Sequence, residues 1–592
     1  MKNVFTKSDG FKSEYSCGVV RVGELTPIEG SDFLAKTNVF GTQIVVRRDM
    51  VSEGDIMIYA SNETQLNERF LSVNNLFEIG ERDRNANRDE VNGIMAQYEP
   101  IKNTANEMKE NAKRLKGVIS STSRNIEKQR KNISKINNKL KESCEDRDEM
   151  VARKEELEKK VAELEASLTA KNNELAKLVA DKDKLISDNQ YIVEKAKKLC
   201  GFFNKYGRVK MITLKGEPSF GFLFAPESLF AFDPSITKED VENAIGEEFD
   251  TINGELFVKV YVPYVKEPTP RNNMKNENKR LKKFNRLVDG EFTFHYETAQ
   301  LQKAIERIKP TDIVDITPKV HGTSCIIGRV LVKQPHHLTI ANIFNKLISI
   351  FRLPQTWKMK GYDLVYGPIY SSRKIIRNKY VNPNVIDEVY YNSDIWSEYG
   401  DIIYPYLEEG MTVYGEIVGY VSNGQKMIQK NFDYGCGEGE NKVMFYRITS
   451  TNEENGRKVE WEIPQIKEWT EKLIDRMKES QNENYRRIMP IPILYHGTLA
   501  DLYDVNEEQH WHENVLELMK KDKETLGMEE LEPLCKKQVP REGVVLRIEN
   551  DPIAEAFKLK CTRFLGEESK LMDEIANGNE EVDVEMAEGY DV

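Results

Sequence analysis

The sequence predicts an α+β protein of several domains, with a long helical insertion near its amino-terminal end. Three observations lead to this prediction. Residues 13–80 and 207–224 are rich in short strands, residues 100–198 carry a helical heptad pattern, and residues 290–565 alternate strands with helices. At 592 residues the chain is too long for one hydrophobic core, so two to four domains are expected.

The amino-terminal residues predict a small β-rich unit. The stretches "SCGVVRVGEL", "TQIVVRR" and "GDIMIYA" are β-rich and are bounded by Gly, Pro, Asp and Asn. A similar stretch, "GRVKMITLKGEPSFGFLF", begins at residue 207. We expect residues 1–87 and 200–230 to form one β module, interrupted by an insertion over residues 88–199.

The insertion predicts a coiled coil, because apolar residues recur every seven positions between charged flanks. The repeats are Ile119, Ile126, Ile133 and Leu140; Val161, Leu168 and Leu175; and Leu178, Leu185 and Ile192. If the flanking β stretches form one module, both ends of the insertion lie close together. An antiparallel hairpin satisfies this, with its tip near Cys144 to Asp148 and arms of about 65 Å. The alternative is one long helix that dimerises with a second chain.

The remaining segments differ in charge. Residues 231–288 are expected to connect the domains and contain a basic stretch at 271–286, followed by a large α+β domain at 289–565. Residues 566–592 hold ten carboxylates and one lysine, which predicts an acidic disordered tail. The tail accounts for most of the net charge of −12, so the overall charge says little about what the rest of the chain binds.

Seven scattered cysteines without a C-x-x-C pair predict reduced thiols, with neither a disulfide framework nor a structural zinc site. The sequence has no run of 18 apolar residues and no signal-peptide core at its start. We therefore expect a soluble, cytoplasmic protein without a membrane partner, located in the host cytoplasm if the chain is viral.

One lysine, Lys319, follows an apolar run and precedes Gly322 in "TPKVHGTS". Such residues ordinarily form a turn. Five further stretches follow in order, however. Glu416 and Glu542 each lie inside an apolar strand, where an unpaired carboxylate is unfavourable. Lys558 and Lys560 share one face of another strand. The five stretches are "SSRKIIRNK" (371–379), "VYGEIVGY" (413–420), "VMFYRIT" (443–449), "REGVVLRI" (541–548) and "FKLK" (557–560).

A bound nucleotide accounts for this combination. Two lysines can hold an α-phosphate, two glutamates can hold a ribose hydroxyl and a metal ion, and an aromatic ring can stack on a base. Cationic neighbours would leave part of Lys319 as the free amine, which can attack the α-phosphate of a nucleoside triphosphate and release pyrophosphate.

The ordered set "KVHG", "YGEIVG", "MFYRI", "REGVVL" and "KLK" resembles nucleotidyl motifs I, III, IIIa, IV and V of the covalent nucleotidyltransferase superfamily of ligases and mRNA-capping enzymes. The resemblance implies a nucleotidyltransferase fold, similar to an ATP-grasp ligase, for residues 289–565. Three features resemble ATP-dependent RNA ligases. His321 stands in the Asp position of motif I, and the β module lies in front of the domain. The 32 residues after Lys560 are too few for the OB domain that follows motif V in DNA ligases and capping enzymes. The branch with an N-terminal OB module, a β-barrel found in Deinococcus-type and phage enzymes, is the most similar. The helical insertion has no counterpart there.

The resemblance also implies roles for individual residues. Lys319 would be the nucleophile that forms lysyl-AMP, and Glu416 would bind the adenosine ribose. Either Tyr446 or Phe445 would stack on adenine, because these strand neighbours face opposite ways.

Three further roles concern phosphate and metal. Glu542 would hold the metal ion or its waters, Lys558 and Lys560 would contact the α-phosphate, and Arg373 would bind another phosphate. His321 would either contact the substrate or simply fill the Asp position.

The implied reaction is the sealing of a 3′-OH to a 5′-phosphate in RNA or in a nicked RNA/DNA duplex, as in RNA repair, with ATP and Mg²⁺ or Mn²⁺ as cofactors. The basic stretch 271–286 and the OB module would bind the nucleic acid. The chain is expected to be a monomer, and the hairpin is a possible binding site for a protein partner. Two alternatives remain, a capping-type guanylyltransferase and a non-catalytic nucleic-acid clamp tethered by the coiled coil.

Overall fold

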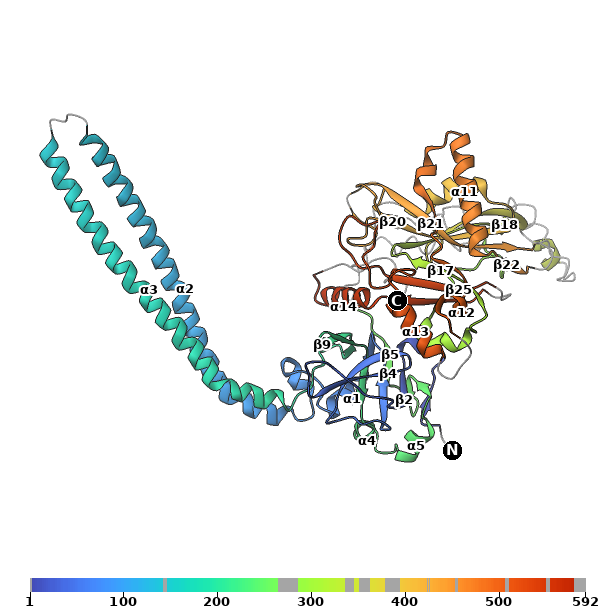
Figure 1. Ribbon diagram of the computed structural model, residues 1–592, viewed down its shortest axis with the longest axis horizontal. Helices are drawn as coiled ribbons and strands as arrows, with labels where there is room; N and C mark the ends of the chain where they lie inside the picture. The colour runs from blue at the N-terminus through green and yellow to red at the C-terminus, as the bar shows by residue number, and fades with distance from the viewer. Residues whose placement is uncertain are drawn as a thin grey trace.

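The computed structural model consists of a β-rich module, a long pair of helices and a larger C-terminal domain (Figure 1). The helix pair projects from the β-rich module, while the C-terminal domain lies against the module on another side. The structure describes residues 3–141, 146–263, 286–335, 345–350, 362–377, 394–422, 424, 426–452, 456–505, 511–549 and 554–579.

The β-rich module (residues 3–87 and 200–263) is a set of small sheets of short strands. Its largest sheet has the order β11-β6-β2-β12, and a second has the order β15-β7-β8. Buried phenylalanines, including Phe70, Phe249 and Phe257, form its core. The strands are β1 (Phe5–Thr6), β2 (Cys17–Arg21), β3 (Thr26–Pro27), β4 (Leu34–Val39), β5 (Thr42–Arg47), β6 (Ile56–Ala60), β7 (Thr64–Leu66), β8 (Arg208–Val209), β9 (Ile212–Leu214), β10 (Glu217–Ser219), β11 (Phe222–Phe224), β12 (Glu248–Phe249), β13 (Thr251–Ile252), β14 (Glu255–Leu256) and β15 (Val258–Val260).

Strand pairs join the two halves of the module across the insertion. Tyr59 of β6 lies opposite Leu223 of β11, and Thr64 of β7 lies opposite Val209 of β8. The expected boundary at residue 230 is wrong, because β12 pairs with β2 and β15 pairs with β7. These later strands contain only two or three residues each. They are therefore too short to show the alternation by which a strand is recognised in a sequence.

The insertion forms two long helices that lie side by side, α2 (Arg88–Lys139) and α3 (Arg147–Lys197) (Figure 1). Val91 and Ile94 pack with Ile192 and Ala196 near the module, and Arg130 pairs with Glu165 further out, so the helices run in opposite directions. Residues 142–145, where the tip was expected, lie outside the described residues. Pro100 lies inside α2 near its beginning. A proline removes one helical hydrogen bond and favours a kink, and the pair is bent close to the module.

The C-terminal domain (described between residues 286 and 579) contains two sheets, which confirms the α+β class. One has the order β16-β26-β25-β17-β24, and the other has the order β19-β18-β20-β21-β22 with β23 beside β21. The strands are β16 (Ala299–Gln300), β17 (Ile313–Lys319), β18 (Thr323–Pro335), β19 (Tyr362–Ser371), β20 (Met411–Gly419), β21 (Asn441–Thr451), β22 (Lys458–Glu460), β23 (Ile488–Pro490), β24 (Tyr495–Thr498), β25 (Gly543–Ile548) and β26 (Ala556–Lys560).

Helices add to one continuous core in this domain. Val314 and Ile316 of β17, Trp396 of α10 and Leu473 of α11 are all buried in it. No helix in the described part of the chain carries an apolar stretch that could cross a lipid bilayer. The longer helices are α10 (Ile395–Ile403), α11 (Ile463–Glu479), α13 (Trp511–Lys521) and α14 (Thr562–Ala576).

Helix α14 corrects the expectation of a disordered tail beginning at residue 566. Its apolar residues Phe564, Met572 and Ile575 are buried, and they recur at helical spacing between the carboxylates. The expectation of disorder rested on the number of acidic residues and did not consider the spacing of the apolar ones. Residues 580–592 of the expected tail and residues 264–285, which hold nearly all of the basic stretch, lie outside the described residues.

Ion pairs join the β-rich module to the C-terminal domain. The side chain of Arg208, 1% exposed, contacts Glu63 at 2.7 Å within the module and Asp573 of α14 at 2.8 Å. Lys303 of the C-terminal domain contacts Glu248 of the module at 2.9 Å. The module is therefore held beside the domain that contains the motif residues.

Candidate active site

Strand register brings three of the motif residues together. Lys319, the last residue of β17, lies opposite Gly543 of β25, and Gly543 lies opposite Lys560 of β26. Gly543 has a φ of +146°, and a Cβ there would stand 2.0 Å from the Leu559 carbonyl oxygen. Only glycine permits this close approach. The two lysines therefore stand on either side of the carboxylate that precedes Gly543.

That carboxylate, Glu542, is the centre of the cluster. Its Oε1 lies 2.7 Å from Lys319 Nζ and 3.6 Å from Lys560 Nζ, and its Oε2 lies 3.4 Å from His321 Nδ1. The side chain is 3% exposed. Burial alone would raise the pKa of Glu542, but Lys319, His321 and Lys560 outweigh it and hold that pKa well below its ordinary value. Glu542 is thus a buried carboxylate that carries full negative charge.

Residues of the second sheet fix the loop after Lys319. Gly322 donates its backbone N–H to Glu416 Oε1 at 3.1 Å, and a Cβ at Gly322 would stand 2.3 Å from the Ile417 carbonyl oxygen. His321 donates its backbone N–H to the Tyr434 hydroxyl at 2.8 Å. The glycine after Lys319 is therefore required by close contact with β20, and Glu416 is brought next to the lysine loop.

The His321 ring points toward Glu542 and packs edge-on against two aromatic rings. The ring centroids of Phe432 and Phe564 lie 4.8 Å and 5.0 Å away, respectively. His321 thus reaches the side of Glu542 that Lys319 leaves free. The sequence left two roles open for His321, contact with the substrate or simply filling the Asp position of motif I. The contact with Glu542 favours the second role.

Lys558 and Lys560 lie on one face of β26, while Phe557 and Leu559 are buried on the other. Lys560 contacts Glu568 of α14 at 2.8 Å, and Lys558 contacts Glu14 of the β-rich module at 3.1 Å. Burial lowers the pKa of Lys558 despite Glu14. Burial also opposes the charge of Lys560, but Glu568 and Glu542 raise its pKa above the ordinary value. Both lysines are paired with carboxylates that an anionic ligand would replace.

Arg373 contacts two residues that precede Lys319 in the chain, His295 and Glu297. Its Nη2 contacts Glu297 at 3.0 Å, and its carbonyl accepts the backbone N–H of His295 at 3.3 Å. Burial, together with the charges of Arg373 and Lys319, lowers the pKa of His295 well below its ordinary value. Burial alone would raise the pKa of Glu297, but Arg373, His295 and Lys558 lower it. Through these two residues Arg373 is electrostatically linked to Lys319 and Lys558.

Phe445 does not face Glu416. In the register of β20 and β21, Glu416 lies opposite Met444 and Gly415 lies opposite Phe445, so Phe445 points to the other face of the sheet. There it is fully buried and packs edge-on against Trp469 of α11. Tyr446 is half-buried and occupies the irregular position where the register shifts. The register therefore speaks against Phe445 as the predicted stacking residue, and Tyr446 is the more exposed of the two.

The residues present fit a divalent cation bound through a single carboxylate. Among the described residues, no three His, Cys, Asp or Glu side chains form a metal site by themselves. Glu542 Oε2 is buried without a hydrogen bond, and its contact with His321 is long. Mg²⁺ and similar ions commonly bind one or two carboxylates and complete their shell with phosphate oxygens and water. Glu542 is suited to such a cation.

Sequence reasoning missed four residues of this site. His295 and Glu297 come from "FHYET", a short stretch outside the motifs, and Glu568 was hidden in the expected tail. Glu14 comes from the β-rich module, and nothing in its local sequence points to Lys558. Only "FHYET" gave a usable signal, since it combines aromatic, histidine and carboxylate side chains a short distance before Lys319.

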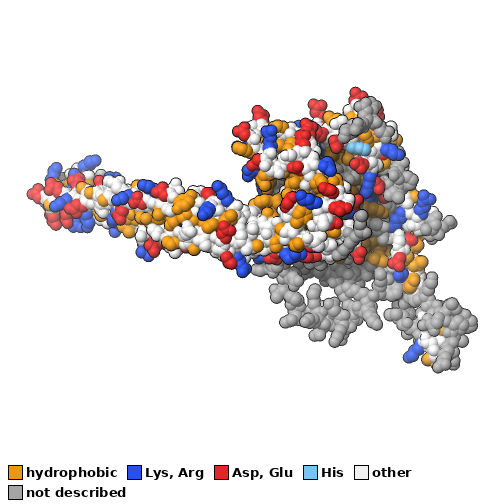
Figure 2. Space-filling model, turned by 90° about the horizontal axis from the view of Figure 1, so that it is seen from below, with side chains coloured by type: hydrophobic (Ala, Val, Ile, Leu, Met, Phe, Trp, Pro, Cys, Tyr) orange, Lys and Arg blue, Asp and Glu red, His pale blue; other side chains and the backbone are white. Residues whose placement is uncertain are grey.

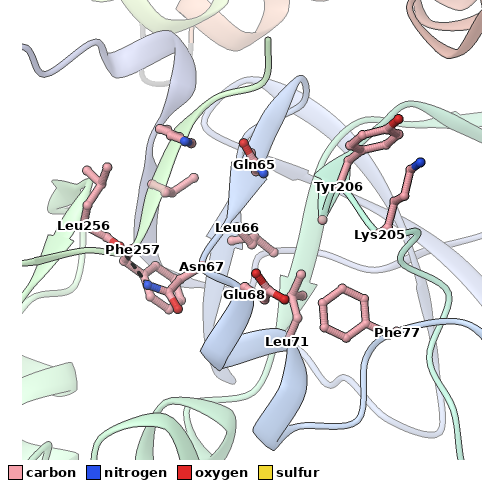
Figure 3. A pocket seen from close by; sticks show the side chains of 13 residues that line it. Gln65, Leu66, Asn67, Glu68, Leu71, Phe77, Lys205, Tyr206, Leu256 and Phe257 are labelled. Carbon is pink, nitrogen blue, oxygen red and sulfur yellow. Dashed lines mark hydrogen bonds between the residues drawn. The ribbon is translucent and has the colours of Figure 1, made fainter. Parts of the chain in front are cut away.

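A separate pocket of about 270 Å³ lies in the β-rich module (Figure 3). Lys205, Tyr206 and Lys259 line it, together with apolar residues such as Leu71 and Phe77. None of the motif residues borders this pocket. It is therefore distinct from the cluster around Lys319.

Comparison with known proteins gives a distant likeness. No family model matches the chain, and no curated protein matches it. Among solved structures, the RNA ligase of Naegleria gruberi with pyrophosphate is similar with a TM-score of 0.40 and 11% identity, covering 94% of this chain and 98% of that one. A variant of that ligase with AMP and Mn gives 0.40 and 12%, covering 93% and 98%. A likeness at this level carries no argument about the reaction, which rests on the geometry of the site.

Proposed function

We propose that the protein is an ATP-dependent RNA ligase that joins a 3′-OH to a 5′-phosphate through an AMP adduct on Lys319. The observation that carries this proposal is the cluster of Lys319, Glu542 and Lys560 at the ends of three adjacent strands, with Glu416 brought in from the second sheet. A nucleophilic lysine beside a buried carboxylate and further lysines suits transfer of a nucleoside monophosphate.

In the first step, the free amine of Lys319 attacks the α-phosphorus of ATP. A P–N bond forms, the bond to the β-phosphate oxygen breaks, pyrophosphate leaves and the amine loses its proton. Without nucleotide, Lys319 Nζ lies 2.7 Å from Glu542 Oε1, a contact that attack on the phosphorus would break. Mg²⁺ or Mn²⁺ bound at Glu542 would neutralise phosphate charge. Lys558 and Lys560 would exchange Glu14 and Glu568 for phosphate oxygens, and Arg373 would bind a further phosphate.

Two residues would hold the nucleoside. Glu416 would accept a hydrogen bond from the ribose while its other oxygen keeps the Gly322 N–H. Tyr446 would stack on adenine. In the following steps, AMP passes from Lys319 to the 5′-phosphate of a strand, and the neighbouring 3′-OH attacks that phosphate and releases AMP.

The substrate would be RNA or a nicked RNA/DNA duplex. We propose that the β-rich module is of the OB type and binds a strand with the basic stretch 271–286. The pocket with Lys205, Tyr206 and Lys259 offers it both charge and an aromatic surface. We further propose that the chain is a monomer whose helices form an intramolecular coiled coil.

The test of this function is adduct formation with labelled nucleotide. Wild-type protein incubated with α-labelled ATP and Mg²⁺ should gain an AMP label that is stable in base and labile in acid. The Lys319→Ala variant should remain unlabelled and folded. A GMP adduct formed in a parallel incubation with α-labelled GTP, and no AMP adduct, would instead indicate a capping-type guanylyltransferase. A folded wild-type protein without any adduct would indicate a non-catalytic clamp. AMP mapped to a different lysine by mass spectrometry would contradict the assignment of Lys319.

A further inference from the structure

The two helices of the insertion differ strongly in charge. Residues 111–141, in the outer half of α2 and just beyond its end, hold ten Lys or Arg residues and a single acidic residue, Glu127. Helix α3, over residues 147–197, has eleven basic and twelve acidic residues. Figure 2 shows acidic and basic side chains together at the tip of the pair. One helix of the pair is therefore basic over a long stretch, while its neighbour is nearly neutral.

The basic residues of α2 form a stripe on its solvent-facing side. Several of them stand two residues from an isoleucine of the apolar seam, as Arg124 and Lys128 do from Ile126. Two residues correspond to about 200° around a helix, which is the opposite face. The basic stripe comprises Lys113, Arg124, Lys128, Lys131, Lys135 and Lys139, and all of these residues are exposed. From Arg124 to Lys139 they recur every three or four residues, over about 22 Å.

Most of this charge is not neutralised within the protein. Lys131 contacts Glu127 at 2.9 Å, and Arg124 donates to the Ser120 hydroxyl at 3.1 Å. Arg130, which lies off the stripe, is the residue that reaches α3, at Glu165. The other four residues of the basic stripe form no ion pair with any described residue. Because unpaired like charges repel one another, a row of them along a helix indicates an anionic partner.

The other residues of this segment indicate which anion. Residues 111–141 contain eleven Ser, Thr, Asn or Gln residues and no aromatic residue. Hydroxyl and amide groups, with Lys and Arg, are the side chains that contact nucleic-acid phosphates. A helix that lies on a membrane needs an exposed apolar face. The seam of α2 instead faces α3, and Ile126 is buried there.

We propose that the basic stripe on α2 binds the sugar–phosphate backbone of the nucleic acid that the C-terminal domain seals, at a distance from the break. This inference rests on the proposed function for the identity of the partner. Contacts of this kind are independent of sequence and weaken steeply with salt. The helix pair would then add phosphate contacts along a duplex, far from the break. The ligase would therefore bind two ends within one structured RNA more tightly than two separate strands.

The experiment compares two five-residue variants of the full chain. The stripe variant changes Lys113, Arg124, Lys128, Lys135 and Lys139 to glutamine, which preserves helix propensity. The matched control changes five exposed lysines of α3 to glutamine, namely Lys159, Lys160, Lys177, Lys184 and Lys195. Binding of a fluorescent nicked RNA duplex is measured by anisotropy from 50 to 200 mM NaCl.

The stripe variant should bind at least about tenfold more weakly, and its salt slope should fall by about two to four units, since each lost phosphate contact removes about 0.9. The control should match wild type within about twofold. Equal RNA binding by both variants would overturn the proposal. So would a stripe variant that loses binding to anionic vesicles or polyglutamate but not to RNA. If the stripe variant unfolds by circular dichroism, the double variant Lys128→Glu, Lys135→Glu replaces it. Both variants should still form the Lys319 adduct. If wild type forms none, the proposed function fails while the difference in RNA binding remains measurable.

Discussion

At the scale of single residues, the site depends on glycines as much as on charged groups. Gly322 and Gly543 each stand so close to a neighbouring strand that a Cβ would meet a carbonyl oxygen at 2.3 Å or less. One glycine sets the loop after Lys319, and the other sets the distance between β25 and β26. The positions of Lys319, Glu542 and Lys560 therefore follow from backbone contacts.

Gly543→Ala should separate β25 from β26 and displace Lys560 from Glu542. We expect loss of most adduct formation and a destabilisation of about 2 kcal/mol, from the strained φ and the contact with Leu559. Gly216→Ala is the control, because Gly216 also has a positive φ but has no atom within 4 Å of an added Cβ. Urea unfolding and AMP labelling of both variants check this. Equal labelling of the two would contradict the role of Gly543.

His295 should make the protein sensitive to acid. Its pKa is lowered in the folded state, first by burial and then by Arg373 and Lys319, whereas the unfolded chain titrates near the ordinary value of about 6.5. Its contribution to stability is therefore complete above about pH 6.5 and is lost as the pH falls below it, since only the unfolded chain gains the proton. His295→Asn should show a smaller drop in Tm between pH 7 and pH 5 than wild type. An unchanged drop would exclude this contribution.

The sequence singled out Lys319, Glu542 and Lys560, which the structure brings together, because each lies in or directly beside a strand with a recognisable pattern. Tyr446 could not be separated from Phe445, since the choice depends on the register between β20 and β21. Glu14 and Glu568 could not be found at all. Each contacts a lysine through a meeting of separate elements, and no local pattern encodes such a contact.

At the scale of elements, the helix pair is the part of the fold that the sequence predicted most accurately, from its heptad repeats. The pattern located both helices, although α2 begins before Pro100, where the repeat is absent. The base of the pair is a small core of Val91, Ile94, Ile192 and Ala196. This core joins the helices to the module and should be kept in any shortened protein.

Replacing residues 103–188 by a short Gly/Ser linker should leave a soluble protein that forms the AMP adduct as wild type does. The helices lie side by side, so their cut ends can be joined without strain. Sealing of nicked RNA should fall, because the basic stripe is removed. Replacing residues 88–199 instead should lower the Tm, since it also removes the base core. Loss of adduct formation in the shorter deletion would show that the helix pair takes part in the first step.

At the scale of the whole molecule, the fold class and the order of the segments could be predicted, but their contacts could not. Short strands such as β12 and β15 join the module only through pairing with distant residues. The interface between module and C-terminal domain is likewise invisible in the sequence. Arg208 belongs to an unremarkable strand, yet its side chain is almost completely buried between Glu63 and Asp573.

Arg208→Met should lower the midpoint of urea unfolding and weaken the attachment of α14 to the module. Removing one partner of a buried ion pair leaves Glu63 without compensation, at a cost of about 3 kcal/mol. Arg47→Met is the control, because Arg47 pairs with Asp49 on the exposed surface, and its midpoint should stay at the wild-type value. Equal midpoints for the two variants would contradict the importance of this interface.

The insertion of the helix pair between β7 and β8 also governs how the chain can fold as it is made. Thr64 leaves the ribosome long before Val209, its partner, has been synthesised, a delay on the order of ten seconds. Helices form within microseconds from local contacts, whereas the sheet needs contacts between residues far apart in sequence. The antiparallel helices bring residues 88 and 197 together and so shorten the loop that β7 and β8 must close. In the nascent chain, the helix pair should therefore fold before the β-rich module from which it projects.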